Sequence, residues 1–361
     1  DKYIQGHSNN KKSFLRFHKN DFRLLLCSCT FVKILKFMRS VQAYQELFST
    51  HLQSIAFAKE PLGLYDPISY ILKLGGKRMR PVLSLMACEA MGKNPSSALG
   101  AATAVELFHN FTLLHDDIMD EASLRRGQQT VHQKWNVNTG ILSGDALLVI
   151  AYQQLNQYED TLFSQLTKLL SETALLVCEG QQYDVDFETR NDVSLDAYIE
   201  MIRLKTAVLL GCALRMGALV GNATAVAADC LYEFGVNLGI AFQLQDDLLD
   251  AFGDPETFGK KVGGDIVENK KTILYHLTMA HANAHDKARF EQLMTSTPAD
   301  ENKKITAVKT IYEATEVPRR TVEQVFAYTS KAMDALQQST LSSDQIAFFT
   351  AFAEELMVRT K

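Results

Sequence analysis

Proline is scarce in this sequence. Only 7 of the 361 residues are proline, and Pro95 is the only one between Asn94 and Asp254. Because proline interrupts helices, this scarcity permits long unbroken ones. Apolar residues recur at spacings of three and four, as in AVELFHNFTLLHDDIM, without a convincing strand-like alternation. We therefore predict an all-α fold that forms a single helical bundle.

Long apolar runs and patterned cysteines are also missing. The best membrane candidate, TAVLLGCALRMGALVG, carries Arg215 in its middle and falls short of the roughly 18 to 20 apolar residues of a stable span. The six cysteines have neither metal-site nor disulfide-framework spacing: Cys27, Cys29, Cys88, Cys178, Cys212 and Cys230. This usage indicates free thiols in a reducing compartment, so we expect a cytoplasmic protein without a stable membrane span.

An excess of basic residues is absent as well. The formal net charge is -5, which gives no reason to expect a nucleic-acid partner. Residues 1–37 differ, because they carry eight Lys or Arg against two Asp. This extension fits a targeting sequence, a membrane-surface helix, or sequence upstream of a start at Met38, and we favour the last. We expect residues 38–361 to form the functional domain.

Helix punctuation in the remaining sequence is regular. Asp66 and Pro67 suggest an N-cap and a first helical position, and Gly75 and Gly76 suggest the end of the same helix. Further breaks occur at segments such as GKNPSS, RRGQQT and STPADENK. No linker of low complexity divides the chain, and 47% hydrophobic residues suffice for a sizeable core. We expect ten or more helices in one domain.

The first acidic segment comprises Asp116, Asp117 and Asp120. Residues four apart share a helix face, so Asp116 and Asp120 project together and Asp117 flanks them by about 100°. Such carboxylates repel one another unless a cation lies between them, and Mg²⁺ accepts a few carboxylates together with water and phosphate oxygens. The alternative is a solvated acidic face, which the strongly apolar neighbouring residues argue against.

A second acidic segment repeats this spacing at Asp246, Asp247 and Asp250, again within a long apolar stretch. Two such segments can create a site for several cations, and such a site favours an anion. Basic groups that could hold the anion occur at Lys77, Arg78, Arg80, Arg125, Arg126, Lys205, Lys260, Lys261, Lys270 and Lys271. Each cluster alone is usually a solvated surface. Together with the repeated acidic segment they indicate Mg²⁺-dependent diphosphate chemistry.

From about Met38 onward the chain resembles the trans-isoprenyl diphosphate synthases, which are head-to-tail prenyltransferases. The resemblance is carried by GGKRMRP, LLHDDIMDEASLRRG, EGQQYD, LKTAVLL and FQLQDDLLDAFGDPETFGKKVGGDI, in the order and approximate spacing of that family. It implies an all-α fold with a deep central cavity, and a homodimer. It also implies that isopentenyl diphosphate condenses with an allylic diphosphate.

The resemblance assigns roles to individual residues. The catalytic set is Asp116, Asp117, Asp120, Asp246, Asp247, Asp250 and Lys205, and all of these except Asp247 and Lys205 are expected to bind Mg²⁺, three ions per active site. The allylic diphosphate is expected at Arg125, Lys205, Thr206, Gln243, Lys260 and Lys270. Isopentenyl diphosphate is expected at Lys77, Arg80, His109 and Arg126. The doubled Lys260 and Lys261 leave open which lysine faces the site.

Product length is expected to depend on Phe111 and Thr112. Phe111 precedes Asp116 by five residues, which is about 7.5 Å of helix rise, so its ring could close a tunnel beneath the diphosphate. In the family, a bulky residue at this position limits the product, which favours C15–C20 products and geranylgeranyl diphosphate in particular. Phe111 could instead be ordinary core packing.

The sequence leaves two other functions open. A terpene cyclase shares the Mg²⁺-triggered ionisation, but it is expected to have a different second metal motif and does not need GGKRMRP to hold a second diphosphate. A non-catalytic subunit of a prenyl synthase would normally lack some of the aspartates, and here all six are present.

Overall fold

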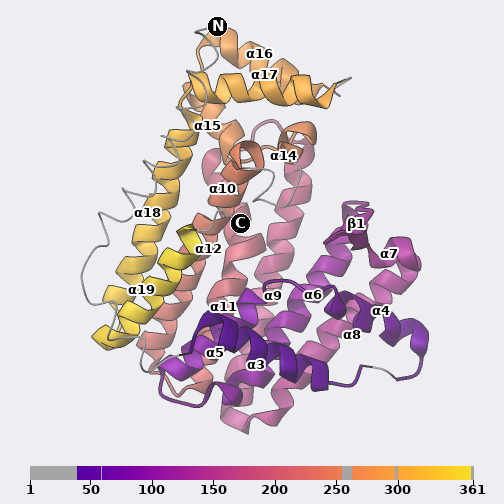
Figure 1. Cartoon of the computed structure of the whole chain (residues 1–361), viewed down its shortest axis with the longest axis vertical. Helices are drawn as coiled ribbons and strands as arrows, with labels where there is room; N and C mark the ends of the chain where they lie inside the picture. The colour runs from indigo at the N-terminus through magenta and orange to yellow at the C-terminus, as the bar shows by residue number, and fades with distance from the viewer. Residues whose placement is uncertain (1–38, 58, 254–261, 297–299, 359–361) are drawn as a thin grey trace, which may run out of the picture.

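The computed structural model describes residues 39–57, 59–253, 262–296 and 300–358, and regular structure there is almost entirely helical (Figure 1). The α-helices are α3 (Val41–Ser54), α4 (Leu62–Lys73), α5 (Met79–Ala90), α6 (Leu99–Met119), α7 (Val131–Lys134), α8 (Val137–Gln153), α9 (Asp160–Thr189), α10 (Leu195–Ile202), α11 (Val208–Val220), α12 (Ala225–Phe252), α14 (Gly264–Val267), α15 (Ile273–His281), α16 (Ala284–Thr295), α17 (Glu301–Ala314), α18 (Val317–Gln337) and α19 (Ser343–Val358). The shorter elements are η1 (Pro95–Ala98), η2 (Gln154–Gln157), η3 (Arg203–Ala207), β1 (Leu124–Arg125) and β2 (Gln128–Gln129). The predicted all-α bundle is confirmed.

Helix α11 forms the centre of the bundle. Its sequence, VLLGCALRMGALV, is apolar on every side, and a helix with this composition has to be buried. It packs against α5, α6, α9 and α12 (Figure 1). Arg215 is its one charged residue and forms an ion pair with Asp229 of α12 at 2.7 Å. The core therefore holds the long helices around α11 in fixed positions.

Helix α12 is the described helix that is long and apolar enough to cross a membrane by length and composition. However, 56% of its most apolar window is buried inside the bundle. It packs extensively on α11 and on α18. Its apolar residues therefore serve the protein core, as in other buried helices.

The predicted start of α4 is wrong. The helix begins at Leu62 rather than at Pro67, and the Glu60 carboxylate accepts a hydrogen bond of 3.0 Å from the Leu62 amide. Pro67 lies inside the helix with a buried ring. The predicted end is close to the observed one, because the helix stops at Lys73 and Gly75 has a φ of 79°.

The predicted break at RRGQQT is a two-stranded hairpin. Leu124 pairs with Gln129 and Arg125 pairs with Gln128. The two linking residues, Arg126 and Gly127, have φ values of 53° and 75°. Positive φ at both central positions characterises the type I′ turn that suits antiparallel strands. The short hairpin therefore holds two consecutive arginines, Arg125 and Arg126, in fixed positions.

Candidate active site

The first acidic segment lies at the end of α6. The helix ends at Met119 and Asp120 is its C-cap, so the carboxylates face the negative end of the helix dipole, which is unfavourable without a cation. Burial raises the pKa of Asp116 to about 6. Lys205 opposes this rise, and the neighbouring Asp120 and Asp117 add to it. Asp116 is therefore half-buried within a crowded set of carboxylates.

Asp117 is held by the hairpin. Arg125 donates from Nε and Nη2 to the Asp117 Oδ1 atom, at 2.7 Å in each case. The Asp117 side chain is fully buried, and burial raises its pKa despite the arginine. Asp117 was predicted as a metal ligand and Arg125 as a diphosphate ligand, and here the two side chains bind each other.

The second acidic segment lies in the last two turns of α12. Asp247 is buried, and it accepts hydrogen bonds from the Tyr198 hydroxyl of α10 and, at 3.1 Å, from Gln243 Nε2. Burial raises the pKa of Asp247 to about 7, against these hydrogen bonds. Asp246 and Asp250 are only half-buried. Asp247 thus fixes the end of the helix, whereas Asp246 and Asp250 remain more accessible to solvent.

The chain beyond α12 returns to Asp250. Asp250 accepts hydrogen bonds from the Gly263 amide at its backbone oxygen, at 2.7 Å, and from the Asp265 amide at Oδ2, at 3.1 Å. Lys270 lies 3.7 Å from Asp265 Oδ1 and 2.8 Å from Glu268 Oε2. Burial works against the charge of Lys270, but these carboxylates raise its pKa above the ordinary value. The Lys260 and Lys261 predictions fall outside the described residues.

Lys205 and Thr206 occupy η3, a single π-helical turn between α10 and α11. Such turns occur often at functional sites. Helix α9 approaches this turn so closely that a Cβ atom on Gly180 would lie 2.2 Å from the Lys205 backbone nitrogen. The Lys205 ammonium forms an ion pair with Asp184, one turn further along α9. The EGQQYD segment therefore supplies both the space and the charge partner for Lys205.

Charged neighbours connect the two acidic segments. Lys205 acts on the pKa of Asp116 at one end and pairs with Asp184. Asp184 in turn contributes to the raised pKa of Lys270, which lies beside Asp265. Because the Asp265 amide binds the second acidic segment, the end of α6 and the end of α12 lie on the same side of the bundle.

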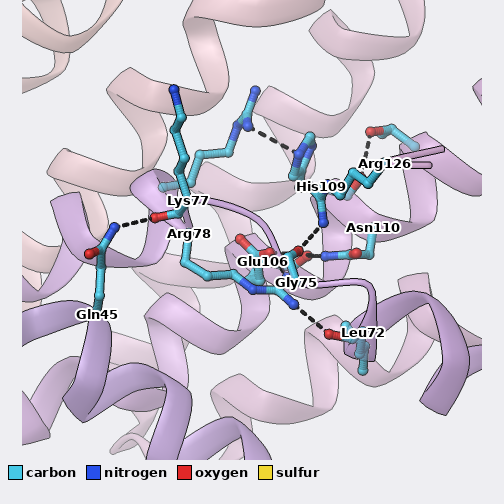
Figure 2. Close-up of polar contacts among 11 residues, drawn as sticks. Gln45, Leu72, Gly75, Lys77, Arg78, Glu106, His109, Asn110 and Arg126 are labelled. Atoms are coloured by element: carbon cyan, nitrogen blue, oxygen red, sulfur yellow. Dashed lines mark hydrogen bonds and ion pairs between the residues drawn. The ribbon is translucent and has the colours of Figure 1, made fainter. Parts of the chain in front are cut away.

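The basic residues predicted for isopentenyl diphosphate gather around His109. Arg80 Nη1 lies 3.1 Å from His109 Nε2, and Arg126 donates to the Gly75 carbonyl (Figure 2). Burial lowers the pKa of His109 well below its ordinary value, and four neighbouring arginines lower it further, so the imidazole is neutral. These contacts of Arg80 and Arg126 are with neutral acceptors, so the positive charge of both guanidinium groups can attract an anion.

Arg78 has a different role from its neighbour Lys77. The two side chains point in opposite directions from the loop before α5 (Figure 2). Arg78 forms a buried ion pair with Glu106 and donates to the Leu72 carbonyl. Asn110 adds a hydrogen bond to Glu106 Oε1 at 3.1 Å. Arg78 therefore anchors the loop that presents Lys77, while the side chain of Lys77 remains exposed.

Phe111 lies on the side of α6 that also carries Phe108 and His115. Its ring centroid is 5.6 Å from that of Phe108 and 4.7 Å from that of His115. Thr112 donates to the His109 carbonyl at 2.9 Å, which places it on the adjoining side. Phe111 is half-buried and lies one and a half turns before Asp116.

The donor set fits Mg²⁺ that is shared with a ligand. Within the described ranges, no three His, Cys, Asp or Glu side chains are close enough to hold a metal ion by themselves. Magnesium seldom uses such all-protein cages, since it keeps water and phosphate oxygens among its ligands. The available donors are hard carboxylate oxygens at two helix ends. The predicted ligands are Asp116, Asp117, Asp120, Asp246 and Asp250, and this assignment stays a prediction.

Three residues of the site were not singled out from the sequence. Asp184 lies within EGQQYD and Asp265 within GGDI, so both segments were recognised without a role for the acid. Tyr198 precedes Lys205 by seven residues, a spacing that returns to the same helix face. This spacing could have predicted that Tyr198 lies near the site.

Comparisons with known proteins identify relatives of this chain. The family model "Polyprenyl synthetase" matches residues 62–312. A geranylgeranyl diphosphate synthase of Methanosarcina mazei is 45% identical over 216 residues, covering 59% of this chain and 67% of the relative. A short chain isoprenyl diphosphate synthase of Methanothermobacter thermautotrophicus is 32% identical over 309 residues, covering 85% of this chain and 94% of the relative.

The fold has a similarly clear counterpart. A crystal structure of a geranylgeranyl pyrophosphate synthase superposes with a TM-score of 0.86 at 48% identity, covering 90% of this chain and 100% of the other. The family match, the relatives and the fold all lead to one assignment: the chain belongs to the polyprenyl synthetase family of trans-prenyltransferases.

Proposed function

We propose that this protein condenses isopentenyl diphosphate with allylic diphosphates to short-chain trans-isoprenyl diphosphates, with geranylgeranyl diphosphate as the favoured product. The observation that supports the proposal is a series of charged neighbours, Lys205, Asp184 and Lys270, that runs from the end of α6 to the turn that binds Asp250. A separate group of basic residues around His109 provides for a second diphosphate. The names of the relatives support the product class.

The allylic diphosphate is assigned to the acidic helix ends. Asp116, Asp117, Asp120, Asp246 and Asp250 would hold Mg²⁺, three ions per site, which when bound makes the diphosphate a better leaving group. Arg125, Lys205, Thr206, Gln243 and Lys270, with Lys260, are the proposed direct partners of its oxygens. Because Asp184 holds the Lys205 ammonium in place, this charge is preorganised for the departing anion.

Isopentenyl diphosphate is assigned to Lys77, Arg80, His109 and Arg126. Its double bond attacks the allylic cation that forms when the carbon–oxygen bond breaks and the electron pair leaves with the diphosphate. The departed diphosphate then accepts the proton that is lost. Because the double bond is the nucleophile and the diphosphate is the base, no side chain has to take either role. The neutral His109 can accept from Arg80 and thereby orient that guanidinium toward the anion.

A homodimer is the proposed assembly. Large apolar side chains are exposed on α8 and α9: Val137, Ile141, Leu142, Val149 and Leu175. Large exposed apolar patches usually mark interaction surfaces. A mass measurement of the protein in solution would test this, and a monomer would contradict it. A cytoplasmic location is proposed from the free cysteines among the described residues.

The central experiment incubates the purified protein with Mg²⁺, isopentenyl diphosphate and each of the C5, C10 and C15 allylic diphosphates, followed by sizing of the products. We expect consumption of isopentenyl diphosphate and accumulation of a C20 product. Release of cyclic hydrocarbon without consumption of isopentenyl diphosphate would identify a terpene cyclase. A protein that binds the substrates and makes no product would be a non-catalytic subunit.

Single variants then assign the reaction to the site. Asp116→Ala or Asp246→Ala should lower turnover by about two or more orders of magnitude while the helical content stays intact. The exposed Asp344, in the first turn of α19, offers a matched Asp→Ala control that should leave turnover unchanged. Near-normal turnover in either site variant would argue against the proposed site.

A further inference from the structure

The α14 turn connects the second acidic segment to the rest of the site. Asp265 at its start donates its backbone amide to Asp250, and Lys270 donates its backbone amide to the Asp265 carbonyl at 2.9 Å. The Lys270 ammonium pairs with the side chains of Asp265 and Glu268. The position of Lys270 relative to Asp250 therefore depends on how this short turn is held.

Helix α17 holds the turn from the other side. Lys304 is only 4% exposed, and its ammonium donates to the Asn269 side-chain oxygen and, at 3.0 Å, to the Ser296 carbonyl. Asn269 has a φ of 59°, so its backbone is in the left-handed region just before Lys270. The two described acceptors of this buried cation are neutral.

A second contact from α17 supports the same turn. Gly263 has a φ of 89°, and a Cβ atom there would lie 2.8 Å from Ile305 Cδ1. Lys304 and Ile305 are consecutive residues of α17. Ile305 packs against Gly263 before α14, and Lys304 binds Asn269 after it, so α17 contacts both ends of the α14 turn. Figure 1 shows α14 directly beneath α17 and close to the end of α12.

Burying an ammonium group is costly compared with an apolar side chain of similar length. Burial lowers the pKa of Lys304, which reflects that cost. An apolar residue would fill this space at α17 more cheaply, but it could not hold the Asn269 oxygen. Lys304 therefore ties α17 to the α14 turn through Asn269 and to the end of α16 through Ser296.

We propose that Lys304 is a positioning residue for the second acidic segment: by binding Asn269 it fixes the α14 turn, and so places Asp265 against Asp250 and Lys270 beside Asp265. This inference rests on the proposed function, because it treats Asp250 and Lys270 as part of an Mg²⁺-diphosphate site. Lys304 itself touches no substrate. Its effect is confined to the allylic half of the site, since the basic residues around His109 lie on other elements.

The test compares Lys304→Met, Asn269→Ala and the double variant with the wild type. Lys303→Met is the matched control, because Lys303 is the neighbouring residue on α17 and its side chain is 86% exposed. Binding of inorganic diphosphate in the presence of Mg²⁺ is measured by calorimetry. The KM values for the allylic substrate and for isopentenyl diphosphate are measured separately.

We expect Lys304→Met and Asn269→Ala each to weaken binding of Mg²⁺ with diphosphate roughly 10-fold, the usual scale for the loss of a supporting contact. The KM for the allylic substrate should rise as this binding weakens, while the KM for isopentenyl diphosphate stays constant. The double variant should be no weaker than either single variant. Lys304→Arg should restore much of the binding, and Lys303→Met should match the wild type.

Three results would overturn the proposal. They are wild-type binding in Asn269→Ala, losses that multiply in the double variant, and equal KM increases for both substrates. If Lys304→Met does not fold, Asn269→Ala decides the question, because it keeps Lys304 and removes only the contact. If the wild type forms no prenyl product, the proposed function fails, whereas the calorimetric comparison still decides the role of Lys304.

Discussion

Arg125 holds Asp117 with two nitrogen atoms, each 2.7 Å from the same carboxylate oxygen. The middle aspartate of the second acidic segment is held in a comparable way, by Tyr198 and Gln243. In both segments, protein donors engage the middle carboxylate, and the flanking aspartates are more accessible. Asp117 and Asp247, the middle residues of two segments far apart in the sequence, are therefore both held by hydrogen bonds from other side chains.

This arrangement predicts unequal effects of Asp→Asn substitutions. Asp116→Asn should lower kcat by about two or more orders of magnitude, because it removes a charge from the site. Asp117→Asn should have a much smaller effect, since an amide oxygen can still accept from Arg125. Steady-state kinetics at several Mg²⁺ concentrations would measure both. Equal losses in the two variants would contradict the distinction between middle and flanking positions.

The buried ion pair between Arg78 and Glu106 predicts a large stability effect. Arg78→Met should destabilise the protein by roughly 3–5 kcal/mol, because Glu106 is left buried without its partner. Denaturant unfolding would measure this. The double variant Arg78→Met/Glu106→Gln should recover part of the loss. The exposed Lys168–Glu172 pair is the control, and Lys168→Met should cost at most about 0.5 kcal/mol.

Gly180 predicts a sharp steric effect on activity. In Gly180→Ala the new methyl group would meet the Lys205 backbone, so η3 must shift and the ammonium must leave its place. We expect kcat/KM to fall on the order of 100-fold, the usual scale for a misplacement near 1 Å. Gly63→Ala on α4 should leave kcat/KM unchanged, since a Cβ there has no neighbour within 4 Å. Wild-type kcat/KM in Gly180→Ala would show that η3 can shift without consequence.

Phe111 predicts a change in product length. Phe111→Ala removes a ring that lies 4.7 Å from His115, and should let the growing chain extend further along α6. Chromatographic sizing should then show products longer than those of the wild type. Phe348→Ala, which removes a half-buried ring on α19, is the control and should leave the profile unchanged. An unchanged profile in Phe111→Ala would assign that ring to core packing.

His276 predicts a pH-dependent loss of stability. Burial lowers its pKa from 6.5 to about 4, so between these values the unfolded chain binds a proton that the folded protein does not. This contribution to stability is complete above pH 6.5 and is lost as the pH falls toward 4. At pH 5 the loss amounts to about 2 kcal/mol.

The effect can be isolated with His276→Phe, which keeps an aromatic ring beside Tyr198. Between pH 7 and pH 5, the free energy of unfolding of the wild type should fall about 2 kcal/mol more than that of the variant. Denaturant titrations at the two pH values give the comparison. Parallel decreases in both proteins would mean that His276 does not contribute.

The sequence was most informative where periodicity and spacing carry the signal. The helices with the two acidic segments, and the ends of those helices, follow from apolar spacing and from the positions of Asp116 and Asp246. The start of α4 was missed because a proline at a helix start has the same local signature as Pro67 within a helix. The hairpin was missed because two residues per strand give no alternation.

Side-chain partners could not be predicted in the same way. The contacts of Lys205 with Asp184, and of Asp247 with Tyr198, join residues from different helices. The crossing of those helices is set by packing around α11 rather than by local sequence. Arg78 illustrates the same point, because its neighbours Lys77 and Arg80 look equivalent in the sequence although Arg78 is paired within the core.

The tight turn at Arg126 and Gly127 has one more consequence. Arg125 reaches the end of α6, and Arg126, the next residue, reaches the loop before α5. In the proposed assignment of the two diphosphates, a single peptide unit therefore sets the distance between them, and adding or removing one residue here would alter the distance between the reacting carbons. Enzymes of this design should tolerate changes in hairpin sequence far better than changes in hairpin length.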